Sequence, residues 1–228
     1  MPGAWEILKV RQQRVLMVTI TPPELKVSLQ WARMLRALWL PPDSITIDLR
    51  GLPFHAARNA ALKYALDGGF GSLFFLDSDT VPLPDVVQRL LEAGRDLIAG
   101  LYYRRGPPFK PAAGNAGRDQ AGELTILDLQ PHHPGDIIPV DFLPSGCTLI
   151  SRRCMEALRA VYPRPFDWGV DIVRVPDGNG GLLPPFSEDF IFSWRCRELG
   201  YQPWLHTGVV CTHELSAVAT YRGVEVPE

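Results

Sequence analysis

Along the first half of the chain, short apolar runs alternate with segments in which apolar side chains recur at helical spacing. The runs are rich in apolar and β-branched residues, which is typical of buried strands, and they predict strands at 15–20, 44–49, 72–77 and 96–100. The segments between them predict helices at 27–38, 56–66 and 84–91. This alternation predicts an α/β fold with a mostly parallel central sheet and helices on both faces.

After Tyr103 the regular alternation weakens. Gly, Pro and basic residues are frequent in 104–122, and short strands are expected at 124–129 and 147–151. This part should be mixed and loop-rich. We therefore expect a single domain, 1–228, made of two halves at about 15–103 and about 104–214.

Composition narrows the class of protein. With 228 residues, of which 46% are hydrophobic and 21% charged, the chain can bury a substantial core by itself. Its 23 Lys and Arg against 25 Asp and Glu leave a net charge of -2, which argues against binding to nucleic acid or to an anionic membrane. No apolar run is long enough to span a bilayer and the N-terminus has no signal pattern, so a cytoplasmic location is expected. The 4 cysteines form no CxxC pair, which favours reduced core thiols.

Two carboxylates follow the third predicted strand directly. The run Phe74 to Leu76 is apolar, and Asp77-Ser78-Asp79 comes next. Carboxylate oxygens suit a divalent cation and, through it, a diphosphate. An ordinary turn is the alternative, because Asp and Ser are common in turns. The pattern favours a site for nucleotide chemistry.

Other polar residues end neighbouring strands. Thr21 follows the first predicted strand, and Asp48 lies near the end of the second. Because ligands bind at the carboxyl ends of parallel strands, we expect both side chains to gather near the two acids.

Four separated motifs occur in a fixed order over about 15–214. They are Ala57-Arg58-Asn59-Ala60-Ala61-Leu62, Phe75-Leu76-Asp77-Ser78-Asp79, the segment Ser145 to Arg153, and Ser187-Glu188-Asp189-Phe190. Together they resemble the motifs of the GT-A glycosyltransferases, especially the family-2-like group that uses nucleotide sugars. The chain departs from that group at Asp48-Leu49-Arg50-Gly51, where an Asp-Asp-Gly-Ser-type loop is usual, and at Ala60-Ala61, where a glycine often follows.

The resemblance implies a Rossmann-like GT-A fold, with a nucleotide-sugar-binding half before an acceptor and catalytic half. It implies a UDP- or GDP-sugar as donor, a carbohydrate or other hydroxyl compound as acceptor, and Mn²⁺ or Mg²⁺ as cofactor. By the same resemblance Asp79 binds the cation directly, and Asp77 holds the ribose or reaches the cation through water. His213 would complete the cation site, and a structural or surface histidine is the alternative.

The fourth motif supplies the candidate base. Ser187 is a good N-cap, and it places Glu188 and Asp189 in the first turn of a helix. The resemblance implies that Asp189 is the general base, with Glu188 as the close alternative; ordinary capping acids remain possible. The resemblance also implies inversion by direct displacement, but retaining enzymes share the GT-A core, so the stereochemical outcome stays open.

The remaining residues expected on the donor side are Thr21, Asp48, Arg58, Ser78 and Gly146. Asp48 is the candidate nucleoside contact, with a strand-ending turn as its alternative. Arg58 would contact the diphosphate or brace the first acid of the strand end, unless it is simply solvated.

Two further segments have expected roles near the site. Tyr102-Tyr103-Arg104-Arg105-Gly106 would supply stacking and anion binding, or would be a surface cluster. The glycine-containing segment 168–185 would close over the donor, or would be a loop with no gating role.

Three other classes compete with the transferase. A haloacid-dehalogenase-like phosphatase would use Asp77 and Asp79, with Lys110, Asp136 and Asp141 as its later residues, but its acidic motif should follow the first strand of the chain. A sugar nucleotidyltransferase would need a glycine-rich basic loop where the chain has Thr21-Pro22-Pro23. A non-catalytic module that binds nucleotide sugar or carbohydrate is the third alternative.

Overall fold

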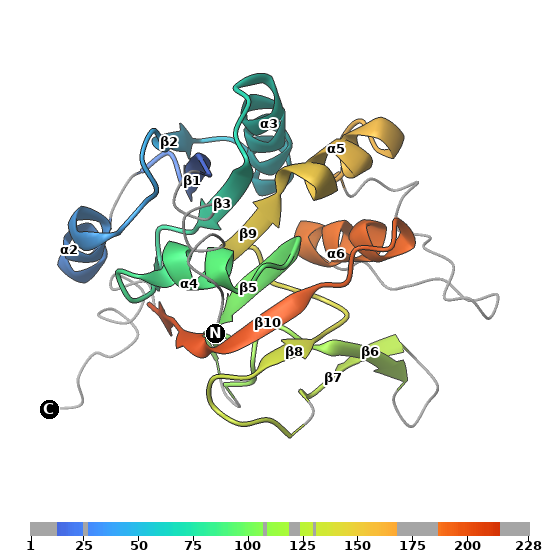
Figure 1. The fold of residues 1–228 in the computed structure, drawn as a ribbon. Helices are drawn as coiled ribbons and strands as arrows, with labels where there is room; N and C mark the ends of the chain where they lie inside the picture. The colour runs from blue at the N-terminus through green and yellow to red at the C-terminus, as the bar shows by residue number, and fades with distance from the viewer. Residues whose placement is uncertain are drawn as a thin grey trace, which may run out of the picture.

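The computed structural model describes residues 13–24, 27–106, 109–118, 124–129, 131–167 and 187–214. Its centre is a seven-stranded sheet, with strand order β2-β1-β3-β9-β5-β10-β8 (Figure 1). The strands, in chain order, are β1 (Val15–Thr21), β2 (Ile45–Arg50), β3 (Ser72–Leu76), β5 (Leu97–Leu101), β8 (Ile137–Pro139), β9 (Cys147–Ser151) and β10 (Trp204–Val210).

The sheet is mixed. β1 runs parallel to β2 and β3, and β5 runs parallel to β10, whereas β9 is antiparallel to both β3 and β5. β8 is antiparallel to β10 at the edge. The predicted α/β fold is confirmed, but the sequence did not predict that β9 enters the middle of the sheet. This insertion brings Cys147 opposite Leu76, so the segment before β9 meets the acidic end of β3.

Helices cover both faces of the sheet, as predicted (Figure 1). One face packs against α3 (Phe54–Asp67), α5 (Arg152–Val161) and α6 (Glu188–Glu198), and the other against α2 (Leu29–Ala37) and α4 (Val86–Glu92). Alternation along β3 produces the two layers, because Leu73 and Phe75 point to the first face and Phe74 and Leu76 to the second. All four side chains are fully buried.

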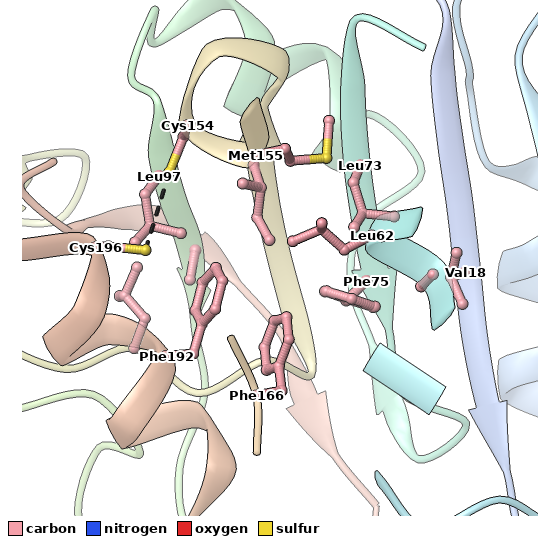
Figure 2. Packing of buried hydrophobic residues seen from close by; sticks show 14 of the residues in the cluster. Val18, Leu62, Leu73, Phe75, Leu97, Cys154, Met155, Phe166, Phe192 and Cys196 are labelled. Atoms are coloured by element: carbon pink, nitrogen blue, oxygen red, sulfur yellow. Dashed lines mark hydrogen bonds between the residues drawn. The ribbon is translucent and has the colours of Figure 1, made fainter. Parts of the chain in front are cut away.

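Aromatic packing joins the first layer to the chain that follows α5. Phe166 lies edge-on to Phe75 at 5.8 Å and stacks on Phe192 of α6 at 4.1 Å between ring centroids (Figure 2). The Sγ atoms of Cys154 and Cys196 lie 3.9 Å apart in the same layer. α3, α5 and α6 therefore share one apolar core behind the carboxyl end of β3.

Two short antiparallel pairs complete the described structure. β6 (Asn115–Arg118) pairs with β7 (Leu124–Leu127), and β4 (Thr80–Val81) pairs with β11 (Thr212–His213). Ser187 is the N-cap residue of α6, although its side chain makes no capping hydrogen bond. The predicted closing segment 168–185 lies outside the described residues. Within the described part of the chain, none of the helices has both the length and the apolar character that crossing a bilayer requires.

Candidate active site

The turn after β3 is held by hydrogen bonds from three directions. The backbone N–H of Asp77 donates to the carbonyl of Gly146 at 2.9 Å, and the N–H of Thr80 donates back to the carbonyl of Asp77 at 3.1 Å. The indole Nε1 of Trp31 also donates to the Asp77 carbonyl, at 3.1 Å. The two carboxylates therefore project from a fixed backbone, and Ser78 lies half-buried between them.

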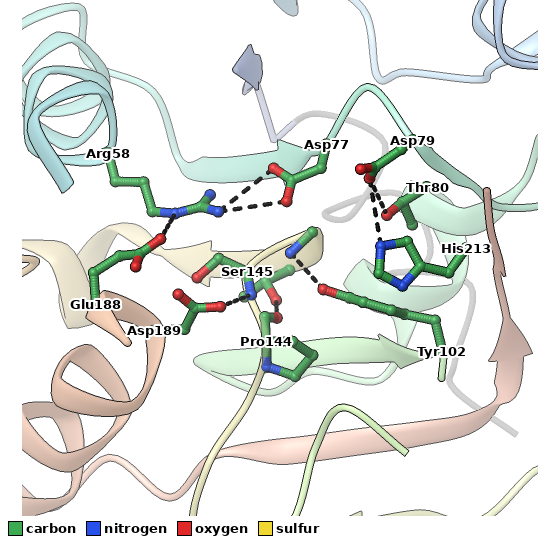
Figure 3. Close-up of polar contacts among 12 residues, drawn as sticks. Arg58, Asp77, Asp79, Thr80, Tyr102, Pro144, Ser145, Glu188, Asp189 and His213 are labelled. Atoms are coloured by element: carbon green, nitrogen blue, oxygen red, sulfur yellow. Dashed lines mark hydrogen bonds and ion pairs between the residues drawn. The ribbon is translucent and has the colours of Figure 1, made fainter. Parts of the chain in front are cut away.

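The carboxylates of Asp77 and Asp79 face different partners (Figure 3). Both oxygens of Asp77 lie 3.5 Å from Nη2 of Arg58. Oδ1 of Asp79 instead lies 3.6 Å from Nε2 of His213. The acidic strand end thus forms two adjacent sites, one built around a buried arginine and one around an imidazole.

Arg58 links the two halves of the chain. It lies on α3 with its side chain buried, and its Nε is 3.4 Å from Oε1 of Glu188 at the start of α6. Burial alone would lower the pKa of Arg58, but the charges of Asp77, Asp189 and Glu188 outweigh it and raise the pKa. The guanidinium therefore stays charged. Its Nη1 is buried without a hydrogen-bond partner among the described residues.

Asp189 has a different environment from its neighbour Glu188. Its Oδ2 accepts a hydrogen bond from the backbone N–H of Ser145 at 3.1 Å. Burial raises the pKa of Asp189 to about 6, with the charge of Arg58 acting against this and that of Glu188 adding to it. Asp189 is therefore ionised at neutral pH and still basic enough to accept a proton.

Gly146 allows the closest approach in the site. A Cβ atom there would lie 2.5 Å from the hydroxyl of Tyr102 and 3.1 Å from Oδ2 of Asp77. The N–H of Gly146 donates to that hydroxyl at 2.8 Å. Burial raises the pKa of Tyr102, and the charges of Asp77 and Asp189 add to this, so the phenol keeps its proton. Tyr102 was expected only as part of a stacking cluster, and no local signal in the sequence indicates its place beside Gly146.

His213 reaches the site through strand pairing. β11 pairs with β4 so that His213 lies opposite Thr80, and the N–H of Glu214 donates to the carbonyl of Asp79 at 2.7 Å. Nδ1 of His213 lies 2.8 Å from the carbonyl of Tyr103. Because a carbonyl only accepts, Nδ1 carries the hydrogen and Nε2 presents its lone pair on the side of Asp79.

The pair Asp79 and His213 fits a divalent cation by its chemistry. Burial lowers the pKa of His213, which keeps the imidazole neutral, and a neutral imidazole beside a carboxylate suits Mn²⁺. Within the described ranges, no group of three or more His, Cys, Asp or Glu side chains is placed to hold a metal ion. A cation bound to these two side chains would need further oxygen ligands to complete its coordination.

Thr21 and Asp48 form a separate pair at the ends of β1 and β2. The hydroxyl of Thr21 donates to Oδ1 of Asp48 at 2.7 Å, and Oδ2 of Asp48 lies 3.7 Å from Nε of Arg50. The structure thus brings the two predicted residues together on neighbouring strands, of which β1 adjoins β3.

The residues of the phosphatase pattern have other partners. Lys110 pairs with Asp128 at 2.8 Å, and Asp141 pairs with Arg197 of α6 at 2.8 Å. The carboxylate of Asp136 accepts from the N–H of His133 at 2.7 Å in a turn. Each of these contacts braces a loop or a strand in the C-terminal half, which weakens the phosphatase alternative.

Comparison with known proteins extends the picture of the fold. No family model matches the sequence, and no curated protein matches it. Among solved structures the chain is similar to A197 from STIV, with a TM-score of 0.57 and 18% identity, over 88% of this chain and 86% of A197. It is also similar to GalNAc-T7, solved with UDP, GalNAc and Mn²⁺, with a TM-score of 0.50 and 9% identity, over 89% of this chain and 44% of that chain. At such identities the likeness concerns the fold, and this fold resembles that of the GT-A glycosyltransferases, as predicted.

Proposed function

We propose that the protein is a metal-dependent glycosyltransferase that moves a sugar from a nucleotide diphosphate sugar to an acceptor hydroxyl. The observation that carries the proposal is the meeting of four separate segments at the end of β3. They contribute Arg58, Asp77, Gly146 and Asp189, beside the pair of Asp79 and His213. A divided site of this kind can hold a donor on one side and an acceptor on the other.

On the acceptor side, Asp189 is the general base. Its carboxylate takes the proton of the acceptor hydroxyl as that oxygen bonds to the anomeric carbon. The bond from the anomeric carbon to the diphosphate breaks in the same step, the diphosphate leaves with the electron pair, and the configuration inverts. Glu188 pairs with Arg58 and is the less free of the two acids.

On the donor side, Asp79 and His213 are the residues that would hold Mn²⁺ or Mg²⁺. When bound, the cation supplies positive charge that neutralises the departing diphosphate. Asp77, which Arg58 braces, is assigned to the ribose or to a water-mediated contact with the cation. The positive charge of Arg58 is assigned to the diphosphate as well as to Asp77.

The nucleoside lies, in this proposal, against the pair of Thr21 and Asp48. Their hydroxyl and carboxylate lie near the carboxyl ends of β1 and β2, on the side of the sheet next to β3, where a UDP or GDP moiety would lie. Ser78 and Gly146 line the approach to the diphosphate. Gly146 serves by having no side chain in a position where a Cβ would already be crowded.

A donor panel tests the function. The protein is incubated with UDP-, GDP- and dTDP-sugars and Mn²⁺, and release of nucleoside diphosphate is followed. We expect release with at least one donor, loss of release when Mn²⁺ is chelated, and loss in Asp79→Ala. Asp67→Ala is the matched control, because Asp67 is an exposed carboxylate that pairs with Lys63 one turn away on α3.

The outcomes separate the alternatives. Hydrolysis of a generic phosphomonoester that requires Asp77 would replace the transferase with a phosphatase. Donor binding without turnover would indicate a binding module. Absence of both binding and turnover with every donor would overturn the proposal.

A further inference from the structure

Arg105 contacts both candidate ligands of the cation site. Its Nη2 forms an ion pair with Oδ2 of Asp79. Its Nε donates a hydrogen bond to Nε2 of His213 at 3.1 Å. The hydrogen on Nδ1 of His213 is committed to the carbonyl of Tyr103, so the Nε2 lone pair is the one that Arg105 uses. A basic side chain of the protein therefore engages the same two groups that a cation would need.

We propose that Arg105 and the divalent cation are alternative occupants of the pair of Asp79 and His213, and that the donor diphosphate decides between them. The proposal rests on the proposed function and adds a residue to it. One lone pair serves either an N–H donor or a metal ion, so the Nε2 contact with Arg105 and a bond to the cation exclude each other. Arg105 must leave when the cation binds.

The balance between the two occupants depends on the nucleotide. The side chain of Arg105 is about half exposed, at 48%, so its ion pair with Asp79 is weak and can be broken. With the protein alone, a cation gains two side-chain ligands among the described residues, Asp79 and His213, and must displace a guanidinium. With a diphosphate present, the cation gains phosphate oxygens, and the released guanidinium gains a bidentate partner. Cation and nucleotide should therefore strengthen each other's binding.

The backbone around Arg105 makes the two positions available. The N–H of Arg104 donates to the carbonyl of Lys110 at 2.9 Å, and the N–H of Phe109 donates to the carbonyl of Gly106 at 2.8 Å. These bonds hold the backbone on both sides of Arg105. The exchange therefore needs only a change of side-chain conformation.

Mn²⁺ titrations provide the test. Free Mn²⁺ is measured by its electron paramagnetic resonance signal, with and without UDP, for the wild type and for Arg105→Gln, Arg104→Gln and Asp79→Ala. We expect Arg105→Gln to bind Mn²⁺ alone about tenfold more tightly. The enhancement by UDP, which for coupled sites is on the order of 5- to 150-fold, should be smaller in this variant, because only the part due to the phosphate oxygens remains. Arg104→Gln removes the same charge from the adjacent position and should change Mn²⁺ affinity less than about twofold.

The results distinguish this proposal from the function on which it rests. If Arg105→Gln binds Mn²⁺ no more tightly than the wild type while Asp79→Ala loses binding, the exchange is wrong and the cation site stands. An equal gain in Arg104→Gln also overturns the exchange, because the effect is then one of net charge. If Asp79→Ala binds Mn²⁺ as the wild type does, the cation site itself is wrong.

Discussion

At the scale of single residues, two adjacent acids have unequal chemistry. Glu188 lies 3.4 Å from the guanidinium of Arg58, and its side chain is 12% exposed. Asp189 accepts from the N–H of Ser145 instead, and burial raises its pKa to about 6. The difference comes from their partners, because both acids lie in the same helical turn. Asp189 is therefore the acid that gains or loses its proton near the pH at which a general base works.

The first prediction concerns the pH dependence of transfer. A base acts when it is deprotonated, so kcat/KM should fall as the pH drops through about 6 and should be level above it. Asp189→Asn should retain donor binding and lose about 10²- to 10⁴-fold in kcat. Transfer at the wild-type rate in this variant would show that another group removes the proton.

A substitution at Arg58 tests whether Asp189 causes the fall in kcat/KM at low pH. The charge of Arg58 lowers the pKa of Asp189. Arg58→Gln should therefore raise that pKa and move the fall in kcat/KM to higher pH. Arg14→Gln is the control for a general charge effect. Arg14 lies at the N-terminal end of β1, where its side chain donates to the carbonyl of Asp43 and lies over the ring of Phe70, whereas the active site lies at the carboxyl ends of the strands. If kcat/KM falls at the same pH in Arg58→Gln as in the wild type, a group other than Asp189 causes the fall.

At the scale of elements, the position of α6 depends on the segment that follows α5. Asn59 of α3 donates to Oδ1 of Asp167 at 2.7 Å and accepts from the N–H of Phe166 at 3.1 Å. Nη1 of Arg195, on α6, donates to the carbonyl of Pro165 at 2.6 Å. The segment is therefore tied to both helices, and these helices carry Arg58 and the two acids.

Removing the aromatic ring of Phe166 should weaken this arrangement. The ring is fully buried between Phe75 and Phe192, so Phe166→Ala should lower the free energy of unfolding by about 3–5 kcal/mol, measured by urea denaturation. Phe109→Ala is the matched control, because Phe109 is 55% exposed and should cost less than about 0.5 kcal/mol. Similar losses in the two variants would contradict the packing described for Phe166.

Local pattern predicted most of the elements but not how they pair. The first strand was expected at 15–20 and is Val15–Thr21, and the helix expected at 56–66 is Phe54–Asp67. Apolar periodicity and glycine placement are sufficient for these assignments. The strand expected at 147–151 was also correct, but its antiparallel position between β3 and β5 depends on contacts between distant parts of the chain. A local pattern carries no information about such partners.

At the scale of the whole molecule, the cation site brings together two residues that are far apart in the chain. Asp79 follows β3, whereas His213 arrives through the pairing of β11 with β4. The hydroxyl of Ser28, which caps α2, donates to Oε1 of Glu214 at 2.6 Å and closes the same connection. A ligand bound there should therefore stabilise the whole domain against unfolding, and not one loop alone.

Thermal unfolding tests this connection. A ligand at about one hundred times its Kd adds roughly 2.7 kcal/mol, which for a domain of this size raises Tm by roughly 5–10 °C. We expect that rise with Mn²⁺ and UDP together and a smaller one with either alone. In Asp79→Ala, Mn²⁺ should add nothing to the rise that UDP gives alone. The same rise in Asp79→Ala would place the ligands elsewhere.

The sequence by itself determined the α/β fold, the order of its elements and the residue types of the site. Asp77, Asp79 and the two acids of α6 stand out because an apolar strand or a helix start precedes them directly. Only the tertiary structure decided their partners. Arg58 bridges the two halves, Tyr102 fills the space beside Gly146, and Arg105 contacts both cation ligands. These contacts join residues distant in the chain, and their strength depends on burial and distance, which exist only in the folded molecule.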